Sequence, residues 1–157
     1  MADHSGRPVP CLIVRVLICD DEPSIRELYR FAFEQAGAEV GEAADGNQCI
    51  ESARREHPDM IVLDLFMPDR DGLSALPDLR RECPGASVLM VSAHAGVEVF
   101  ERARSLGAVA CFEKGGFLRR IAQLVDRWDH PTPGDTLFYR RTSSAGTADR
   151  SATNAAN

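Results

Sequence analysis

Five short apolar runs, each followed by a helical pattern, constrain the fold of this chain more than any other feature. The runs cover residues 14–19, 38–43, 60–63, 88–91 and 108–112, the second being the least apolar. Short continuous apolar runs are typical of strands buried on both faces of a sheet. Strands that alternate with helices require crossovers, so the pattern predicts a doubly wound α/β fold, a parallel sheet covered by helices on both faces.

Local signals place the helices between these strands. Pro23 suits a first helical turn, and Gly37 is predicted to end that helix. Asn47 is predicted to cap a second helix that runs to about residue 57. A third helix over residues 73–82 contains Pro77, which predicts either a kink or a start near that proline. The last two helices are predicted over residues 97–106 and 117–128.

Composition excludes several classes of protein. The net charge of -6 and the scattered arginine pairs argue against a direct nucleic-acid partner, because such proteins need a basic surface. No apolar run approaches the roughly 20 residues of a membrane span. We therefore expect a cytoplasmic protein with a flexible leader at residues 1–13, one domain at 14–128 and a disordered tail at 129–157 that holds no output domain.

The five cysteines are Cys11, Cys19, Cys49, Cys83 and Cys111, and no two of them form a CxxC pair. This number and spacing predict reduced thiols rather than a disulfide framework or a zinc site. Cys19 and Cys111 lie inside apolar runs, so we expect both to be buried as small hydrophobic residues.

Polar side chains follow four of the predicted strands. Asp20 and Asp21 follow the first strand, Asp64 the third, Ser92 the fourth and Lys114 the fifth. Each residue alone has an ordinary explanation as a helix cap, a strand-end acid or a solvated charge. Together they would meet at one edge of a parallel sheet, where ligands of such folds bind. Clustered carboxylates need a cation, and Mg²⁺ bound by carboxylates and a phosphate would supply it.

These segments resemble the receiver domains of two-component response regulators. The resemblance rests on residues 16–23, 61–72, 88–93 and 107–114, and it covers about residues 14–128. Asp21 and Asp64 are 43 positions apart, Asp64 and Ser92 are 28 apart, and Ser92 and Lys114 are 22 apart. The resemblance implies a CheY-like, flavodoxin-like (βα)5 fold with strand order 2-1-3-4-5.

The same resemblance implies roles for individual residues. Asp64 would be the phosphoacceptor, with Lys114 paired to the phosphoryl group and Ser92 as the switch hydroxyl. Magnesium would be held by Asp20, Asp21, Asp64 and the backbone carbonyl of Phe66. The donor would be a phosphohistidine on a sensor histidine kinase or a histidine phosphotransfer protein. The signal would pass to a downstream protein effector, with phosphorylation-dependent dimers among the family's outcomes.

The chain departs from the family pattern at several positions. Cys111 stands where the family usually has an aromatic switch residue, and the neighbouring Phe112 should point to the opposite face of the sheet. Gly115 and Gly116 follow the lysine where a proline is common. Phe66 and His94 occupy positions that tune phosphate lifetime in this family. The partner face implied by the resemblance includes Phe100, Cys111, Phe117 and Trp128, with core packing the expected role of at least one.

Three alternative functions are compatible with parts of the same pattern. An enzyme of the haloacid-dehalogenase type expects a second aspartate where Phe66 stands, and a nucleotide-binding flavodoxin-like protein expects a glycine-rich phosphate loop after the first strand. The third is a degenerate receiver that binds proteins without being phosphorylated. The intact acidic set argues against it, whereas Cys111 and the glycine pair keep it open.

Overall fold

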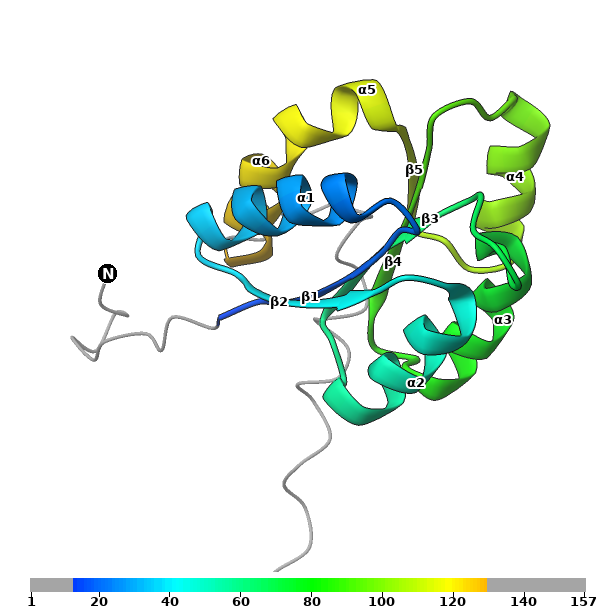
Figure 1. Cartoon of the computed structure of the whole chain (residues 1–157), viewed down its shortest axis with the longest axis horizontal. Coiled ribbons are helices and arrows are strands. Elements are labelled where there is room, and N and C mark those ends of the chain that lie inside the picture. Colours follow the sequence, from blue (N-terminus) through cyan, green and yellow to red (C-terminus); the bar gives the residue numbers. More distant parts are fainter. Residues whose placement is uncertain (1–12, 130–157) are drawn as a thin grey trace, which may run out of the picture.

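The computed structural model describes residues 13–129, so the predictions for residues 1–12 and 130–157 lie outside the described part of the chain. Strands and helices alternate along the chain, as predicted (Figure 1). The strands are β1 Arg15–Cys19, β2 Glu39–Ala43, β3 Met60–Asp64, β4 Ser87–Ser92 and β5 Ala110–Glu113. The helices are α1 Pro23–Gln35, α2 Gly46–Glu56, α3 Gly72–Glu82, α4 Val97–Ser105, α5 Lys114–Phe117, the 3-10 turn η1 Leu118–Arg120 and α6 Ile121–Asp129.

The five strands form one parallel sheet in the order β2-β1-β3-β4-β5, which confirms the predicted flavodoxin-like topology. Helices α1, α5 and α6 cover one face of the sheet, and α2, α3 and α4 cover the other (Figure 1). In the part of the chain that the structure describes, no helix combines the length and apolarity that crossing a membrane requires.

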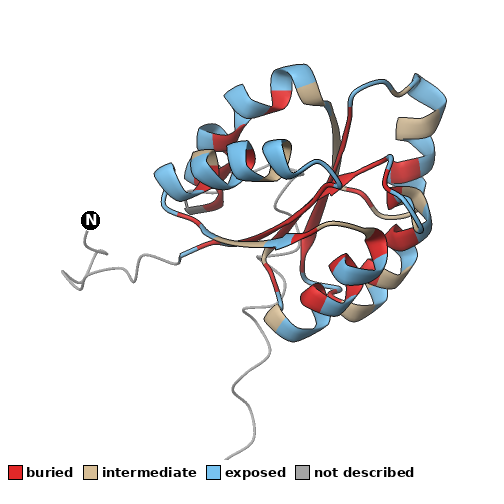
Figure 2. Ribbon diagram, viewed as in Figure 1, coloured by how far each residue is buried: buried red, intermediate tan, exposed pale blue. Residues whose placement is uncertain are grey.

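Each face of the sheet has its own hydrophobic core, and alternate residues of a strand contribute to different cores. On β1, Leu17 packs toward α2 and α3, whereas Val16 and Ile18 pack toward α1 and α6. Successive side chains of a strand point to opposite faces, and here both faces are covered. This explains why the strands are apolar without alternation, and why the central strands appear buried along their length (Figure 2). On β5, Cys111 and Phe112 pack against different cores, as predicted.

Helix ends follow the local signals in most places. Gly37 has φ 95° and ends α1: its N–H donates to the Glu34 carbonyl, and the next N–H donates to the Phe33 carbonyl. Two corrections are needed. Asp45, not Asn47, caps α2, because its side chain accepts a hydrogen bond from the Gln48 N–H at 2.8 Å.

The second correction concerns Pro77. Helix α3 begins at Gly72, with the Asp71 side chain as its cap, and it continues through Pro77. The alternative in which the helix starts near the proline is therefore wrong. Asp71 accepts a hydrogen bond from the Ser74 N–H at 2.8 Å, so the cap fixes the start of the helix well before the proline.

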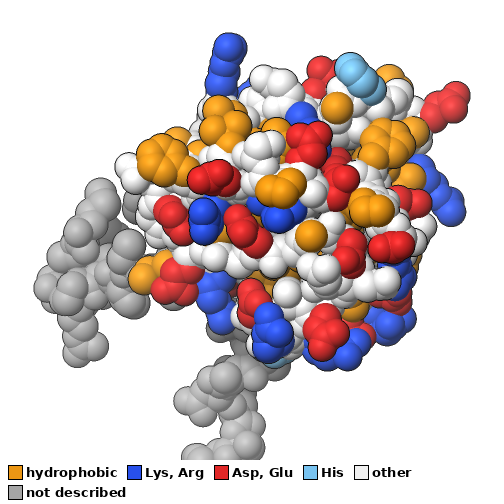
Figure 3. Space-filling model, in the orientation of Figure 1, with side chains coloured by type: hydrophobic (Ala, Val, Ile, Leu, Met, Phe, Trp, Pro, Cys, Tyr) orange, Lys and Arg blue, Asp and Glu red, His pale blue; other side chains and the backbone are white. Residues whose placement is uncertain are grey.

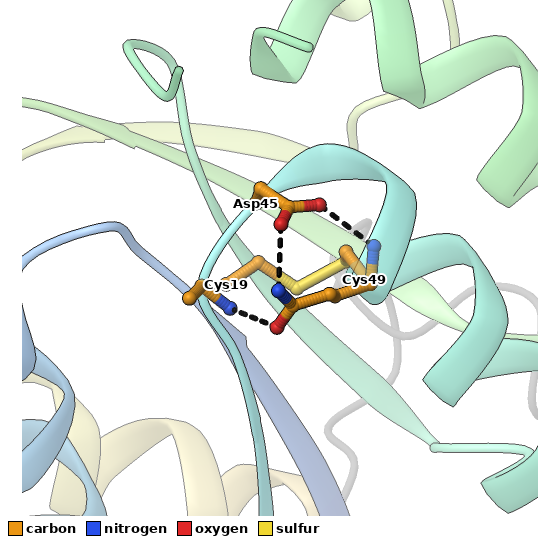
Figure 4. Close-up of a disulfide and its surroundings, with 5 residues drawn as sticks. Cys19, Asp45 and Cys49 are labelled. Atoms are coloured by element: carbon orange, nitrogen blue, oxygen red, sulfur yellow. Dashed lines mark hydrogen bonds between the residues drawn. A yellow bond between two sulfur atoms is a disulfide. The ribbon is translucent and has the colours of Figure 1, made fainter. Parts of the chain in front are cut away.

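The cysteine prediction also needs correction, because Cys19 and Cys49 form a disulfide (Figure 4). They lie 30 positions apart in sequence, yet their Cα atoms are 5.9 Å apart, since α2 packs its first turns against the end of β1. Cys83 is a buried free thiol. Cys111 is free and only partly buried, which corrects the prediction that it is buried; it lies on β5, the edge strand of the sheet.

Candidate functional site

The carboxyl ends of β1, β3, β4 and β5 bring the predicted polar residues together. Asp20 directly follows β1, Asp64 ends β3, Ser92 ends β4, and Lys114 begins α5 immediately after β5. The parallel register carries these ends to one edge of the sheet, with Asp64 opposite Val91 and Ser92 opposite Glu113. The sequence pattern therefore placed these residues at the correct edge of the sheet.

Three carboxylates form the acidic part of the site. One carboxylate oxygen from each of Asp20, Asp21 and Asp64 lies within 4.8 Å of the others. Asp20 and Asp64 are only 2% and 3% exposed, whereas Asp21 faces solvent. Mg²⁺ prefers hard oxygen ligands, and it typically binds one or two carboxylates directly while its remaining positions hold water or phosphate oxygens. The donor set therefore fits the metal that the sequence predicted.

Lys114 is the cation of the site. Its Nζ lies 2.6 Å from Oδ2 of Asp20 and 3.3 Å from Oδ2 of Asp64, and its side chain is 16% exposed. The ammonium thus joins the two buried carboxylates. A phosphoryl group on Asp64 would lie beside this charge.

The pKa values of Asp64 and Lys114 are both raised in this site, for different reasons. The pKa of Asp64 is raised to about 6, mainly by burial and also by the nearby Asp20 carboxylate, while Lys114 opposes the increase. Burial alone would lower the pKa of Lys114, but hydrogen bonding to Asp20 and the two negative charges raise it overall. Lys114 therefore does not fully offset the burial and the Asp20 charge that disfavour the ionised form of Asp64. Additional positive charge at this edge would stabilise that form.

Backbone contacts hold Asp20 in place. Its Oδ1 accepts a hydrogen bond from the Glu22 N–H at 3.0 Å, and its N–H donates to the Ala43 carbonyl at 3.2 Å. Arg26 Nη1 donates to the Asp20 carbonyl at 2.7 Å. Sequence reasoning missed Arg26, and its place in the first turns of α1 after the acidic pair is the signal that could have identified it.

Ser92 is fully buried, and its Oγ has no hydrogen-bond partner among the described residues. An unpaired buried hydroxyl costs about 1–3 kcal/mol, so its retention calls for an explanation. A phosphoryl oxygen bound at this edge would be an acceptor that the fold itself does not provide.

Gly72 shapes the loop beyond Asp64. A side chain at this position would collide with the Asp64 carbonyl and the Leu65 backbone, and the Gly72 N–H donates to the Leu65 carbonyl at 2.9 Å. The loop of residues 65–71 thus folds back against the end of β3. Its Phe66 side chain remains 62% exposed, while the Phe66 backbone lowers the pKa of Asp64 by hydrogen bonding.

The remaining candidate residues are spread over the surface and the core. His94 is exposed, and Phe100 and Cys111 are partly exposed, with Cys111 Sγ 3.7 Å from the Phe100 carbonyl. Phe117 and Trp128 are only 0% and 5% exposed, so their assignment to a partner face is wrong. Their helices turn these aromatic rings toward the sheet, which is the core role expected for at least one of them.

Comparison with known proteins agrees with this geometry. The response regulator receiver domain family matches residues 16–126. The chain is 44% identical over 98 residues to the probable transcriptional regulatory protein TcrX of Mycobacterium tuberculosis, covering 62% of this chain and 40% of TcrX. It is 27% identical to sporulation initiation phosphotransferase F of Bacillus subtilis, covering 73% of this chain and 92% of that protein.

Solved structures show the same likeness. The chemotaxis protein CheY4 of Vibrio cholerae has a TM-score of 0.68 and 26% identity, over 73% of this chain and 98% of that one. The chain spans only 40%, 25% and 52% of the first three curated relatives that it matches. These relatives thus contain long regions that have no counterpart in the matched segment.

Proposed function

We propose that this chain, which belongs to the family of response regulator receiver domains, accepts a phosphoryl group on Asp64 and signals by binding another protein. The observation that carries the proposal is Lys114, whose ammonium contacts both buried carboxylates. Ser92 ends β4 at the same edge of the sheet, and its hydroxyl has no hydrogen-bond partner among the described residues. A carboxylate beside a fixed cation and a spare hydrogen-bond donor suits formation of an aspartyl phosphate.

Asp64 is the better nucleophile of the two buried acids. Asp20 is held by the Glu22 N–H and by Lys114 at 2.6 Å, whereas Asp64 lies farther from Lys114 and has a pKa raised to about 6. One Asp64 oxygen attacks phosphorus, the bond to the donor breaks, and the donor leaves with its electron pair. Lys114 neutralises the phosphoryl oxygens and Ser92 donates to one of them.

Magnesium completes this proposal. Asp20, Asp21, Asp64 and the backbone carbonyl of Phe66 would hold the ion, which supplies positive charge next to the transferring phosphoryl group. We propose that the donor is a phosphohistidine on a sensor histidine kinase or a histidine phosphotransfer protein. We also propose that the chain works in the cytoplasm as a single receiver at residues 14–128, with a protein rather than nucleic acid or membrane as its effector.

Direct phosphorylation tests the acceptor assignment. Acetyl phosphate and Mg²⁺ should add one phosphoryl group to the intact mass of the wild type, and Asp64→Ala or a chelator should abolish that gain. Asp59→Ala is the matched control, because Asp59 lies at the opposite end of β3 and pairs with Arg15. A folded wild type that gains no mass with Mg²⁺ present would contradict the proposal.

Failure of that test would favour the second candidate, a receiver that binds its partner without phosphorylation. The observation behind it is Cys111, a small and partly exposed residue at the position of the family's aromatic switch. Such a chain would capture the same partner before and after treatment with acetyl phosphate. Phosphorylation-dependent capture or dimerisation would instead support the signalling function.

Phe66 is expected to prolong the life of the aspartyl phosphate. Its side chain is two residues beyond Asp64 and 62% exposed, and we propose that the ring obstructs a water that would attack the phosphorylated Asp64. Phe66→Asn should therefore lose its phosphoryl group several-fold faster than the wild type. A rate increase of this size corresponds to an activation free energy lower by about 1 kcal/mol. Decay is followed by intact mass after removal of the donor. Equal or slower decay in the variant would refute this role. His94→Ala tests the second exposed candidate residue in the same assay.

A further inference from the structure

The disulfide joins the acidic site to a helix that otherwise has no part in it. Cys19 is the last residue of β1 and directly precedes Asp20, while Cys49 is the fourth residue of α2. Figure 4 shows the bond between the strand and the first turns of the helix, beside Asp45. A displacement of Cys19 is passed through a single peptide bond to the backbone of Asp20.

Both ends of the bond lie in regular secondary structure. Cys19 pairs with Ala43 on β2 and with Leu63 on β3, so it lies within the sheet. At the other end, the Cys49 N–H donates to the Asp45 carbonyl at 2.9 Å. Asp45 also accepts hydrogen bonds from the Gln48 N–H at 2.8 Å and from Gln48 Nε2 at 2.7 Å.

We propose that Cys19 and Cys49 form a redox modification site that controls the acidic site, with the disulfide form as the competent one. The inference rests on the proposed function for its effect on phosphorylation. With the bond present, the end of β1 is tied to α2 and the three carboxylates lie within 4.8 Å of one another. Reduction removes that tie, frees the two pieces to separate, and loosens the position of Asp20 and Asp21.

The exchange needs an external reagent of a defined class. Hydrogen peroxide oxidises the two thiols in two steps. One sulfur attacks a peroxide oxygen and becomes a sulfenic acid as water leaves. The second thiol then attacks this sulfur, which forms the disulfide and releases the oxygen as another water. A dithiol reverses the reaction, giving two electrons and two protons to the cysteines while it becomes a disulfide. Intracellular disulfides of mesophiles usually serve redox sensing or catalysis, which agrees with a regulatory rather than a structural disulfide.

Access to the sulfurs requires local opening. Cys19 and Cys49 are 1% and 0% exposed, so a reagent reaches them when the first turn of α2 opens. Exchange is therefore expected over minutes to hours. Cys83 provides a matched comparison, because it lies in the same hydrophobic core, is buried and remains a free thiol.

The test compares peroxide-treated and dithiol-treated full-length chain. Alkylation followed by intact mass should show two fewer reactive thiols in the oxidised form under denaturing conditions. Calorimetric titration with Mg²⁺ should give about fivefold weaker binding after reduction. Phosphorylation by acetyl phosphate should be about tenfold slower, within the range that a misplacement of about 1 Å can cause. Cys49→Ala should behave as the reduced form under both treatments, and Cys83→Ala should keep the full redox response.

The outcomes separate the two proposals. A redox-dependent Mg²⁺ affinity without phosphorylation in either state would overturn the proposed function and support the redox site. Phosphorylation at equal rates and equal Mg²⁺ affinity in both states, with the disulfide demonstrated by mass, would overturn the redox site alone. Full alkylation of all cysteines after peroxide would also overturn it. The wild-type comparison decides the matter even if Cys49→Ala fails to fold.

Discussion

Replacing Lys114 with methionine is expected to slow phosphorylation by acetyl phosphate about 10²-fold or more. Removal of one preorganised electrostatic group from a reaction site typically has an effect of this size. Lys114 is the cation that contacts both Asp20 and Asp64, so no other described contact replaces its charge at the phosphoryl position. The initial rate of mass gain in saturating Mg²⁺ measures the effect.

The controls separate position from charge. Arg119→Met removes an exposed cation from the neighbouring η1 turn and should leave the rate unchanged. Lys114→Arg keeps the charge but replaces a compact ammonium with a planar fork, so partial recovery is expected. A wild-type rate in folded Lys114→Met would show that the ammonium has no role in phosphoryl transfer.

Replacing Phe117 with alanine is expected to lower the free energy of unfolding by about 3–5 kcal/mol. The ring is 0% exposed, and its centroid lies 5.2 Å from that of Tyr29 and 5.3 Å from that of Phe112. It also lies 6.4 Å from the Phe33 ring, so its removal would leave a cavity between α1, β5 and α5. Urea unfolding followed by circular dichroism measures the loss.

Phe31 is the matched control for this substitution. It is another aromatic residue, it lies on α1, and it is 62% exposed. Phe31→Ala should therefore change the free energy of unfolding by less than about 0.5 kcal/mol. If the two variants lost stability equally, the buried role of Phe117 would be wrong. If Phe117→Ala remained as stable as the wild type, that result would contradict a core role for Phe117 and would favour the partner-face role predicted from sequence.

The layout of the site was predictable because it depends on the ends of strands. A parallel sheet carries the carboxyl ends of its strands to one edge, so Asp20, Asp64, Ser92 and Lys114 could be placed together from pattern alone. The distances among them could not. Whether Lys114 contacts one carboxylate or both depends on how α5 leaves β5, which no local pattern encodes.

Side-chain direction on the last helices was less predictable. The pattern of residues 117–128 indicated an amphipathic helix, but α5, η1 and α6 divide this region into three pieces. The η1 turn interrupts the helical period between Phe117 and the later apolar residues. Tertiary packing against α1 and the sheet then decides that Phe117 and Trp128 are buried.

The sequence by itself determined the alternating order of elements, the parallel sheet with two covered faces, and the polar residues at its carboxyl edge. These follow from hydrophobic periodicity and from strand ends, which are properties of neighbouring residues. Only the tertiary structure decided that Cys19 meets Cys49, that Lys114 contacts two buried acids, and that Ser92 has no hydrogen-bond partner within residues 13–129. Each of these depends on contacts between residues distant in the chain, and the packing of whole elements sets such contacts.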